Sequence, residues 1–200
     1  MIFSYTNTPE ELFEDMCKME YGYLGKNKLL YRPTDSDFES DWYSQYRLQN
    51  PDILKETMVG NCWDLVEFER AWFENHGYEV RTYFEMLNLP YENPFQTHSF
   101  LVYRDKKDGQ WCWFEVADAD YRGIHKFKNL YDLLDEQFFD AYLVEQAENG
   151  ATDEELRSAL LTRFEQPMTG ITTEEYITHC INSPVVMNKE VCLDLSNMFE

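Results

Sequence analysis

The segment from about residue 60 to 117 constrains the fold most, because one apolar helix pattern is followed directly by strand patterns. Apolar residues recur at helical spacing from Cys62 to His76, and Gly77 is typical of the residue that follows a helix. Strand patterns then cover residues 79–86, 98–104 and 111–117, and the turn-rich segment 105–109 joins the last two. We therefore expect an α+β fold in which a buried helix packs on an antiparallel sheet.

The segment before this unit has two helix starts. Thr8 is followed by a proline and two glutamates, which is typical of a helix start, and we expect that helix to reach about Tyr21. Residues 22–49 indicate an irregular packed segment. Asn50 then predicts the cap of a short helix that ends before Gly60.

The segment after the strands predicts further helices. Residues 130–148 have a helical pattern, an Asn-Gly pair breaks it, and residues 153–164 are typical of an acidic amphipathic helix, with more helical turns around 173–180. We therefore expect one domain over residues 1–150, including its N-terminal helix, and a helical C-terminal extension over residues 151–200.

The charge balance excludes several classes of partner. The chain has 17 Lys and Arg residues against 38 Asp and Glu residues, a net charge of −21. Such a surface repels nucleic acids and anionic membranes, whereas an aromatic content of 16% is too high for a disordered acidic polymer. No apolar run is long enough to cross a membrane. We expect a folded cytoplasmic protein that favours neutral or cationic substrates.

The cysteines do not form a disulfide or zinc pattern. They are five in number and have no C-x-x-C spacing: Cys17, Cys62, Cys112, Cys180 and Cys192. A zinc site built from Cys62, His98, Cys112 and His125 is disfavoured, because strand alternation turns Cys112 away from the face that carries His98. We expect reduced thiols, with no metal and no cofactor.

Cys62 is the candidate nucleophile, because it opens the apolar helix. A helix N-terminus and a nearby imidazole both lower the pKa of a thiol, and the first-turn amides could hold an oxyanion. The alternative interpretation is a small buried hydrophobic residue. His76 lies about 21 Å along the same helix and is excluded, whereas His98 opens a strand and His125 follows the third strand, so either could face the helix start.

The turn between the second and third strands decides which carboxylate meets the histidine. A four-residue loop over 105–108 places His98 directly opposite Glu115 and pairs Phe100 with Trp113. In that register Asp118 and Asp120 point to the opposite face. A tighter turn at residues 108–109 keeps Glu115 on the face of His98 but moves it four residues along the strand.

Three short motifs together resemble the transglutaminase-like superfamily of the papain-like thiol fold. Gly60-Asn61-Cys62-Trp63-Asp64 resembles its G-x-C-W segment, Thr97-His98-Ser99-Phe100-Leu101 its strand histidine, and Gln110 to Glu115 the strand of its third triad member. The wider pattern, with Arg122-Gly123-Ile124-His125, looks like a group from bacteria and their phages. The resemblance implies Cys62 as nucleophile, His98 as general base and acid, and Glu115, where the superfamily usually has aspartate, as the residue that holds the imidazole.

Two functional hypotheses follow. The first is a cysteine enzyme that acts on an amide or ester, in a peptide or protein, by hydrolysis, deamidation or acyl transfer through a thioester. The tryptophans Trp63, Trp111 and Trp113 could then wall a cleft, although their spacing also fits a core. The second hypothesis is a non-catalytic acidic protein that mimics a nucleic acid and binds a basic protein partner.

Overall fold

A six-stranded antiparallel sheet is the centre of the fold. The computed structural model describes residues 6–87 and 97–188. The strands follow the order β10-β9-β5-β6-β7-β8 across the sheet. Their bounds are β5 Val80–Met86, β6 Thr97–Arg104, β7 Trp111–Glu115, β8 Gly123–Phe127, β9 Leu160–Phe164 and β10 Val185–Asn188. The expected α+β class is therefore confirmed, and the three predicted strands correspond to β5, β6 and β7.

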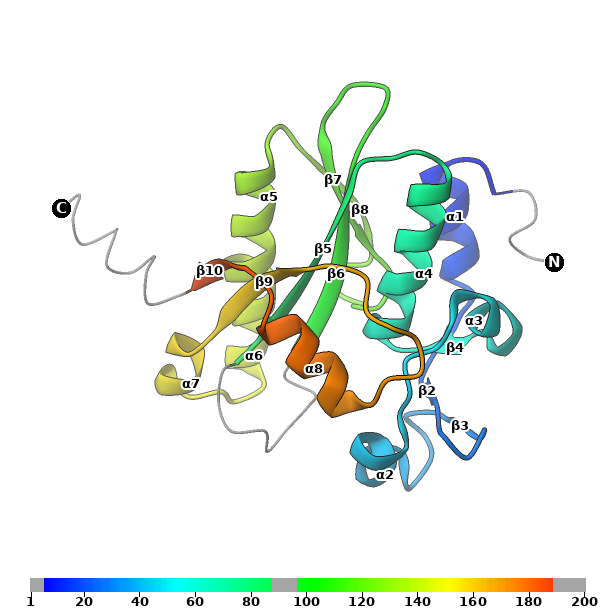
Figure 1. The fold of residues 1–200 in the computed structure, drawn as a ribbon. Helices are drawn as coiled ribbons and strands as arrows, with labels where there is room; N and C mark the ends of the chain where they lie inside the picture. Colours follow the sequence, from blue (N-terminus) through cyan, green and yellow to red (C-terminus); the bar gives the residue numbers. More distant parts are fainter. Residues whose placement is uncertain (1–5, 88–96, 189–200) are drawn as a thin grey trace.

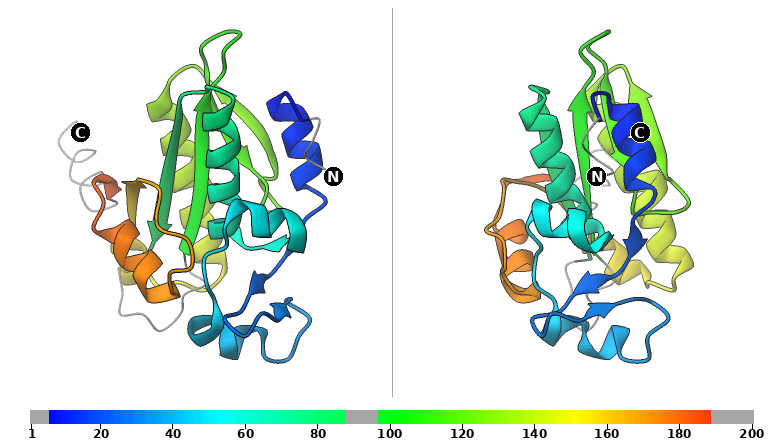
Figure 2. Two further views of the ribbon diagram at one scale, coloured as in Figure 1. Left: turned by 45° about the vertical axis from the view of Figure 1, so that its right-hand side comes forward. Right: turned by 90° about the vertical axis from the view of Figure 1, so that its right-hand side faces the viewer.

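Helices cover both faces of this sheet (Figures 1 and 2). Helix α4 (Cys62–Asn75) packs on one face. Helix α1 (Pro9–Met16) joins the same core through Phe13, whose ring packs edge to face on Phe114 with 5.8 Å between the ring centroids. The other face carries a continuous helical segment made of α5 (Leu130–Asp135), a π-helical stretch (Glu136–Tyr142) and α6 (Leu143–Glu148). Alternate strand residues face the two helical layers, so Leu101 belongs to the α4 core and Phe100 to the other.

The predicted apolar helix is α4. Asn61 caps it, and Asp64 completes a capping box by accepting a hydrogen bond from the Asn61 backbone. Gly77 follows the last turn with a φ of +70°, a value that glycine adopts without strain. Eleven residues of α4 are buried, and they include four charged residues beside large apolar ones such as Trp63 and Phe73.

The N-terminal helix is shorter than predicted. It ends at Met16, because Glu20 and Tyr21 form β1 (Glu20–Tyr21), which pairs in parallel with β4 (Val59–Gly60). Residues 22–49 pack through aromatic rings such as those of Tyr23 and Trp42, whose ring centroids are 5.0 Å apart. They contain β2 (Tyr23–Leu24), β3 (Leu30–Tyr31) and α2 (Phe38–Gln45), and the short capped helix is α3 (Pro51–Thr57). No helix within the described ranges could span a bilayer.

The predicted loop between β6 and β7 is wrong by two residues. Arg104 pairs with Trp111, so the loop covers residues 105–110 and not 105–108. Asp105 holds the longer loop: its backbone N–H donates to the carbonyl of Gln110, and its side chain accepts from the backbone N–H of Lys107. In consequence Trp113 pairs with Val102 and not with Phe100, and Glu115 is not directly opposite His98. A shift of two residues keeps every side chain on its predicted face.

The prediction of a wholly helical segment after residue 150 is also wrong. Helix α7 (Asp153–Arg157) ends early, and β9 pairs with β5 from Thr82↔Phe164 to Met86↔Leu160. The strand buries residues on both faces, and β10 pairs with it in turn. Pairing with a strand some eighty residues away overrides the local helical spacing. The predicted helical turns around 173–180 are confirmed as α8 (Thr173–Ile181).

Candidate functional site

Cys62 begins α4 in a tightly packed entry. The Asn61 side chain accepts hydrogen bonds from the backbone N–H groups of Trp63 (3.0 Å) and Asp64 (3.1 Å). At Gly60 an added Cβ would lie 2.7 Å from a terminal methyl group of Leu54 and 3.0 Å from the Cβ of Asp64, so a larger residue would force these side chains to shift. The Asn61 cap uses the amides of Trp63 and Asp64, which removes them from the oxyanion cradle that the sequence predicts. The Cys62 N–H is the first-turn amide that the cap leaves for this role.

His98 and Glu115 are in direct contact on the face of the sheet opposite α4. The His98 Nε2–H donates to Glu115 Oε2 at 2.9 Å. The same carboxylate accepts from Trp113 Nε1 (3.2 Å) and from the backbone N–H of Asp118 (2.9 Å). Asp118 therefore supports Glu115 through its main chain, while the Glu115 side chain holds the imidazole. The contact is diagonal across the β6–β7 ladder.

Cys62 completes this group: it lines the same pocket as His98 and is close enough to influence the pKa of the His98 imidazole. Burial opposes a charged imidazole, but the Glu115 carboxylate and the contact with Cys62 outweigh it and hold the pKa of His98 well above its ordinary value. Burial also opposes the ionisation of Glu115, yet His98 and the donated hydrogen bonds bring the pKa of Glu115 below its ordinary value. The arrangement thus favours an imidazolium beside a carboxylate, next to a sulfur atom.

A pocket of about 300 Å³ opens onto Cys62 and His98. Its lining comes from five parts of the chain: Tyr21, Cys62, Thr97, His98, Ala117, Asp118, Ala119, Asp120, Glu145 and Gln146. A larger hollow, about 1030 Å³, lies beside α8 and contains neither Cys62 nor His98. The smaller pocket is the one that combines space for a ligand with reactive side chains.

A further buried carboxyl, Glu85, lies opposite His98 on β5 and was missed from the sequence. Glu85 is fully buried and accepts a hydrogen bond from Gln137 of the π-helical stretch, whereas its Oε2 has no partner among the described residues. Burial raises the pKa of Glu85 to about 8, against the influence of His98 and Gln137. The signal in the sequence was a glutamate among apolar residues at the end of the predicted strand 79–86, which indicates a buried carboxyl.

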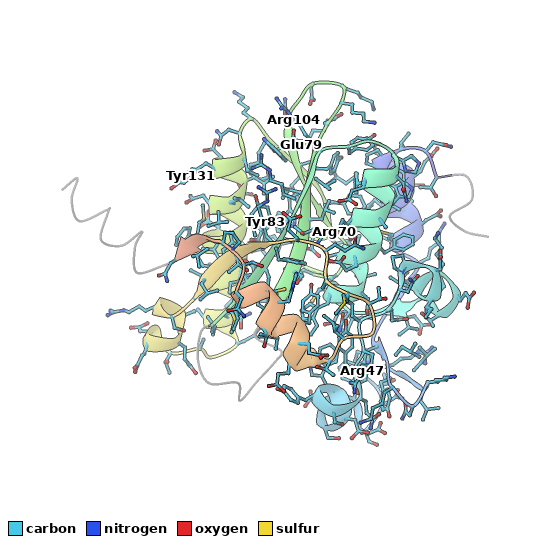
Figure 3. All side chains as sticks on the ribbon, viewed as in Figure 1. Arg47, Arg70, Glu79, Tyr83, Arg104 and Tyr131 are labelled. Carbon is cyan, nitrogen blue, oxygen red and sulfur yellow. The ribbon has the colours of Figure 1, made fainter. Side chains whose placement is uncertain are left out.

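The arginine of α4, Arg70, already has an ion-pair partner. Arg70, at the side of α4 in Figure 3, pairs with Glu67 at 3.0 Å and lies over the ring of Phe164. Both members of this pair are buried. A second buried acid of α4, Glu69, has a pKa well above its ordinary value because of burial and then the proximity of Glu115. Histidine is therefore the cationic partner for the site.

The other candidate residues have structural surroundings. His125 lies on β8, a strand that the sequence did not predict; its Nε2 contacts the Tyr121 carbonyl oxygen at 2.7 Å. Cys112 lies in the α4 core and pairs with Tyr103 across the β6–β7 ladder. Trp63 and Trp113 are buried core residues outside the pocket lining. Within residues 6–87 and 97–188, no group of three or more His, Cys, Asp or Glu side chains could hold a metal ion.

Comparison with protein-family models, with curated proteins and with solved structures gives no match for this chain. The geometry brings together the three side chains that the sequence singled out, in the order thiol, imidazole and carboxylate. Such an order is suited to proton transfer from a thiol to an imidazole that a carboxylate orients.

Proposed function

We propose that the protein is a transglutaminase-like cysteine enzyme that acts on an amide or ester through a covalent thioester. The observation that carries the proposal is the contact chain Cys62–His98–Glu115 at the wall of a pocket. The finer fold assignment rests on the same feature: a cysteine opens a helix packed on the sheet, and the histidine and the carboxylate come from the later strands β6 and β7, as in the papain-like arrangement.

The reaction follows from the position of the protons. His98 first takes the thiol proton of Cys62, which gives a thiolate–imidazolium pair. The sulfur then forms a bond to the substrate carbonyl carbon, and the Cys62 N–H faces the oxyanion. The bond to the leaving amine or alcohol then breaks, and His98 returns the proton to that group. Water, or a second amine, attacks the thioester with His98 as base, and the carbon–sulfur bond breaks. Glu115 keeps the imidazole oriented and stabilises its positive charge.

An acetyl ester tests this proposal without knowledge of the natural substrate. p-Nitrophenyl acetate should transfer its acetyl group to Cys62 with release of p-nitrophenol, and peptide mass spectrometry should locate the added mass on that residue. Cys62→Ala and His98→Gln should abolish the transfer, whereas Cys17→Ala, which removes a half-buried thiol elsewhere, should not. Acetylation of Cys62 that is equally fast in His98→Gln would refute the proposal. Salt-sensitive binding of a basic protein that survives Cys62→Ala would favour the acidic binding protein instead.

We also place the enzyme in the cytoplasm, because its chemistry needs a reduced thiol. Cys17, Cys62, Cys112 and Cys180 are all free cysteines. A reducing compartment keeps such thiols from forming mixed disulfides. Addition of oxidised glutathione should therefore inactivate the enzyme, and dithiothreitol should restore its activity.

A further inference from the structure

The pocket beside Cys62 is lined by an uncompensated group of carboxylates. Asp118, Asp120 and Glu145 contribute to its lining, which includes no lysine or arginine. Over the described ranges, none of the three takes part in an ion pair. Burial and the nearby Asp118 raise the pKa of Glu145, while His98 lowers it. A cation in this pocket would relieve the repulsion among the carboxylates.

A mostly buried side chain, Gln146, adds an unpaired amide to the lining of the same pocket. Gln146 is 5% exposed and lines the pocket next to Glu145, but its side chain has no hydrogen bond in the described part of the chain. Because Gln146 lines the pocket and no protein group in the described residues pairs with its side chain, the amide is available to a polar group of a ligand. The exposed ring of Tyr21 lies in the same lining, and an aromatic face attracts cations.

We propose that this pocket binds the positively charged part of the substrate, so that the enzyme acts on amides or esters of basic peptides. Asp118, Asp120 and Glu145 would attract a lysine or arginine side chain close to the reacting carbonyl. The Gln146 amide would pair with the peptide backbone. This inference rests on the proposed function, because it names the substrate class of the Cys62 site.

Two thiol reagents of opposite charge separate the inference from the proposed function. They are the trimethylammonium-ethyl and the sulfonato-ethyl methanethiosulfonates. In each case the Cys62 sulfur attacks the sulfenyl sulfur, a disulfide forms and methanesulfinate leaves, so no other oxidant is needed. We expect the cationic reagent to modify Cys62 about tenfold faster than the anionic one at low salt. This cation-to-anion rate ratio should be smaller at high salt, because ions screen the pocket charge. Cys17, near Arg122, provides a reference thiol on the same chain.

Charge variants show whether the pocket itself causes the preference. Asp118→Asn with Glu145→Gln should reduce the cation-to-anion rate ratio at Cys62 by several-fold. Glu148→Gln removes the same charge per residue from an exposed position of α6 outside the pocket, and should leave the ratio unchanged. The Asn and Gln substitutions are isosteric, and circular dichroism checks that the variants are folded.

The outcomes are distinct. A Cys62 that reacts with both reagents more slowly than Cys17 would contradict the proposed function. A fast Cys62 with equal rates for the two reagents, or a ratio that Glu148→Gln lowers as much as the pocket variant, would overturn the basic-substrate inference alone. A fast Cys62 with a ratio that only the pocket variant lowers would support it. Steady-state rates on matched lysine and norleucine peptide esters should then show the same preference.

Discussion

Replacing Glu115 by glutamine tests whether the buried carboxylate controls the reactivity of Cys62. Three N–H donors converge on the two oxygen atoms of Glu115, from His98, Trp113 and the Asp118 backbone. A carboxamide has the same shape but only one oxygen, so its NH₂ group must face at least one of these donors. Because the residue is 2% exposed, water cannot replace the lost acceptor.

The magnitude follows from the charge-assisted bond to His98. Hydrogen bonds to charged groups contribute about 1.5–3 kcal/mol, and a factor of ten in an equilibrium corresponds to about 1.4 kcal/mol. Loss of the carboxylate should therefore lower the population of the thiolate–imidazolium pair about ten- to a hundredfold. Alkylation of Cys62 by iodoacetamide should slow by the same factor.

The assay is the pH dependence of that alkylation rate, followed by mass spectrometry of the Cys62 peptide. The pKa of Glu115 is lowered and that of His98 is raised, so the Glu115 carboxylate and the His98 imidazolium form an ion pair from mildly acidic to alkaline pH. It is lost when the pH falls through the pKa of Glu115, and again when it rises through the pKa of His98. The difference between wild type and Glu115→Gln should thus be large at pH 6–7 and should shrink in strong alkali.

Asp118→Asn is the matched control, since its backbone N–H to Glu115 survives the change and only the side-chain charge is lost. It should keep most of the alkylation rate at pH 6–7. Equal rates for Glu115→Gln and wild type across the whole pH range would refute the reasoning. So would a loss in Asp118→Asn as large as that in Glu115→Gln.

Three further predictions concern stability and are checked by urea unfolding. Glu85 keeps its proton in the fold up to about pH 8, whereas an ordinary glutamate loses it near 4.5, so stability should fall between these values by up to about 1.4 kcal/mol per pH unit. Glu85→Gln, which mimics the protonated acid, should flatten this slope; an unchanged slope would contradict the assignment. Leu161→Ala, at a fully buried position of β9, should lower the free energy of unfolding by about 2–5 kcal/mol, against about 0.5 kcal/mol for exposed Arg163→Ala. Asn61→Ala should cost about 0.5–2 kcal/mol through loss of the α4 cap, and Asn61→Ser, which keeps an acceptor, should recover most of it.

The parts of the fold that local patterns determine were predictable. Helix α4 has its own cap, its own apolar spacing and a glycine after its last turn, so neighbouring residues alone define it. Strands β5, β6 and β7 follow short runs of apolar and aromatic residues between turn residues. The candidate site was accessible for the same reason, because Cys62 and His98 lie at the starts of two such elements.

The parts that distant contacts determine were not predictable. Residues 160–164 have a spacing that fits a helix or a strand, and only the pairing of β9 with β5 decides between them. The pocket also depends on contacts between segments that are far apart in the sequence. Gln146 comes from α6, far along the chain from Cys62, so no spacing rule relates the two. Glu85 likewise gains its importance from its cross-strand neighbour His98 and from Gln137.

The error in the β6–β7 register left the site intact because side chains alternate with a period of two. The true register moves Glu115 one pair along the ladder from His98 on the same face, where a diagonal neighbour stays within reach of a long side chain. Continuing the ladder beyond Leu101↔Phe114 would bring Ala117 opposite His98. A small residue at that point leaves room for the pocket, which Ala117 lines. The same geometry requires a long side chain at position 115, because the diagonal contact with His98 needs the methylene group that glutamate has and aspartate lacks.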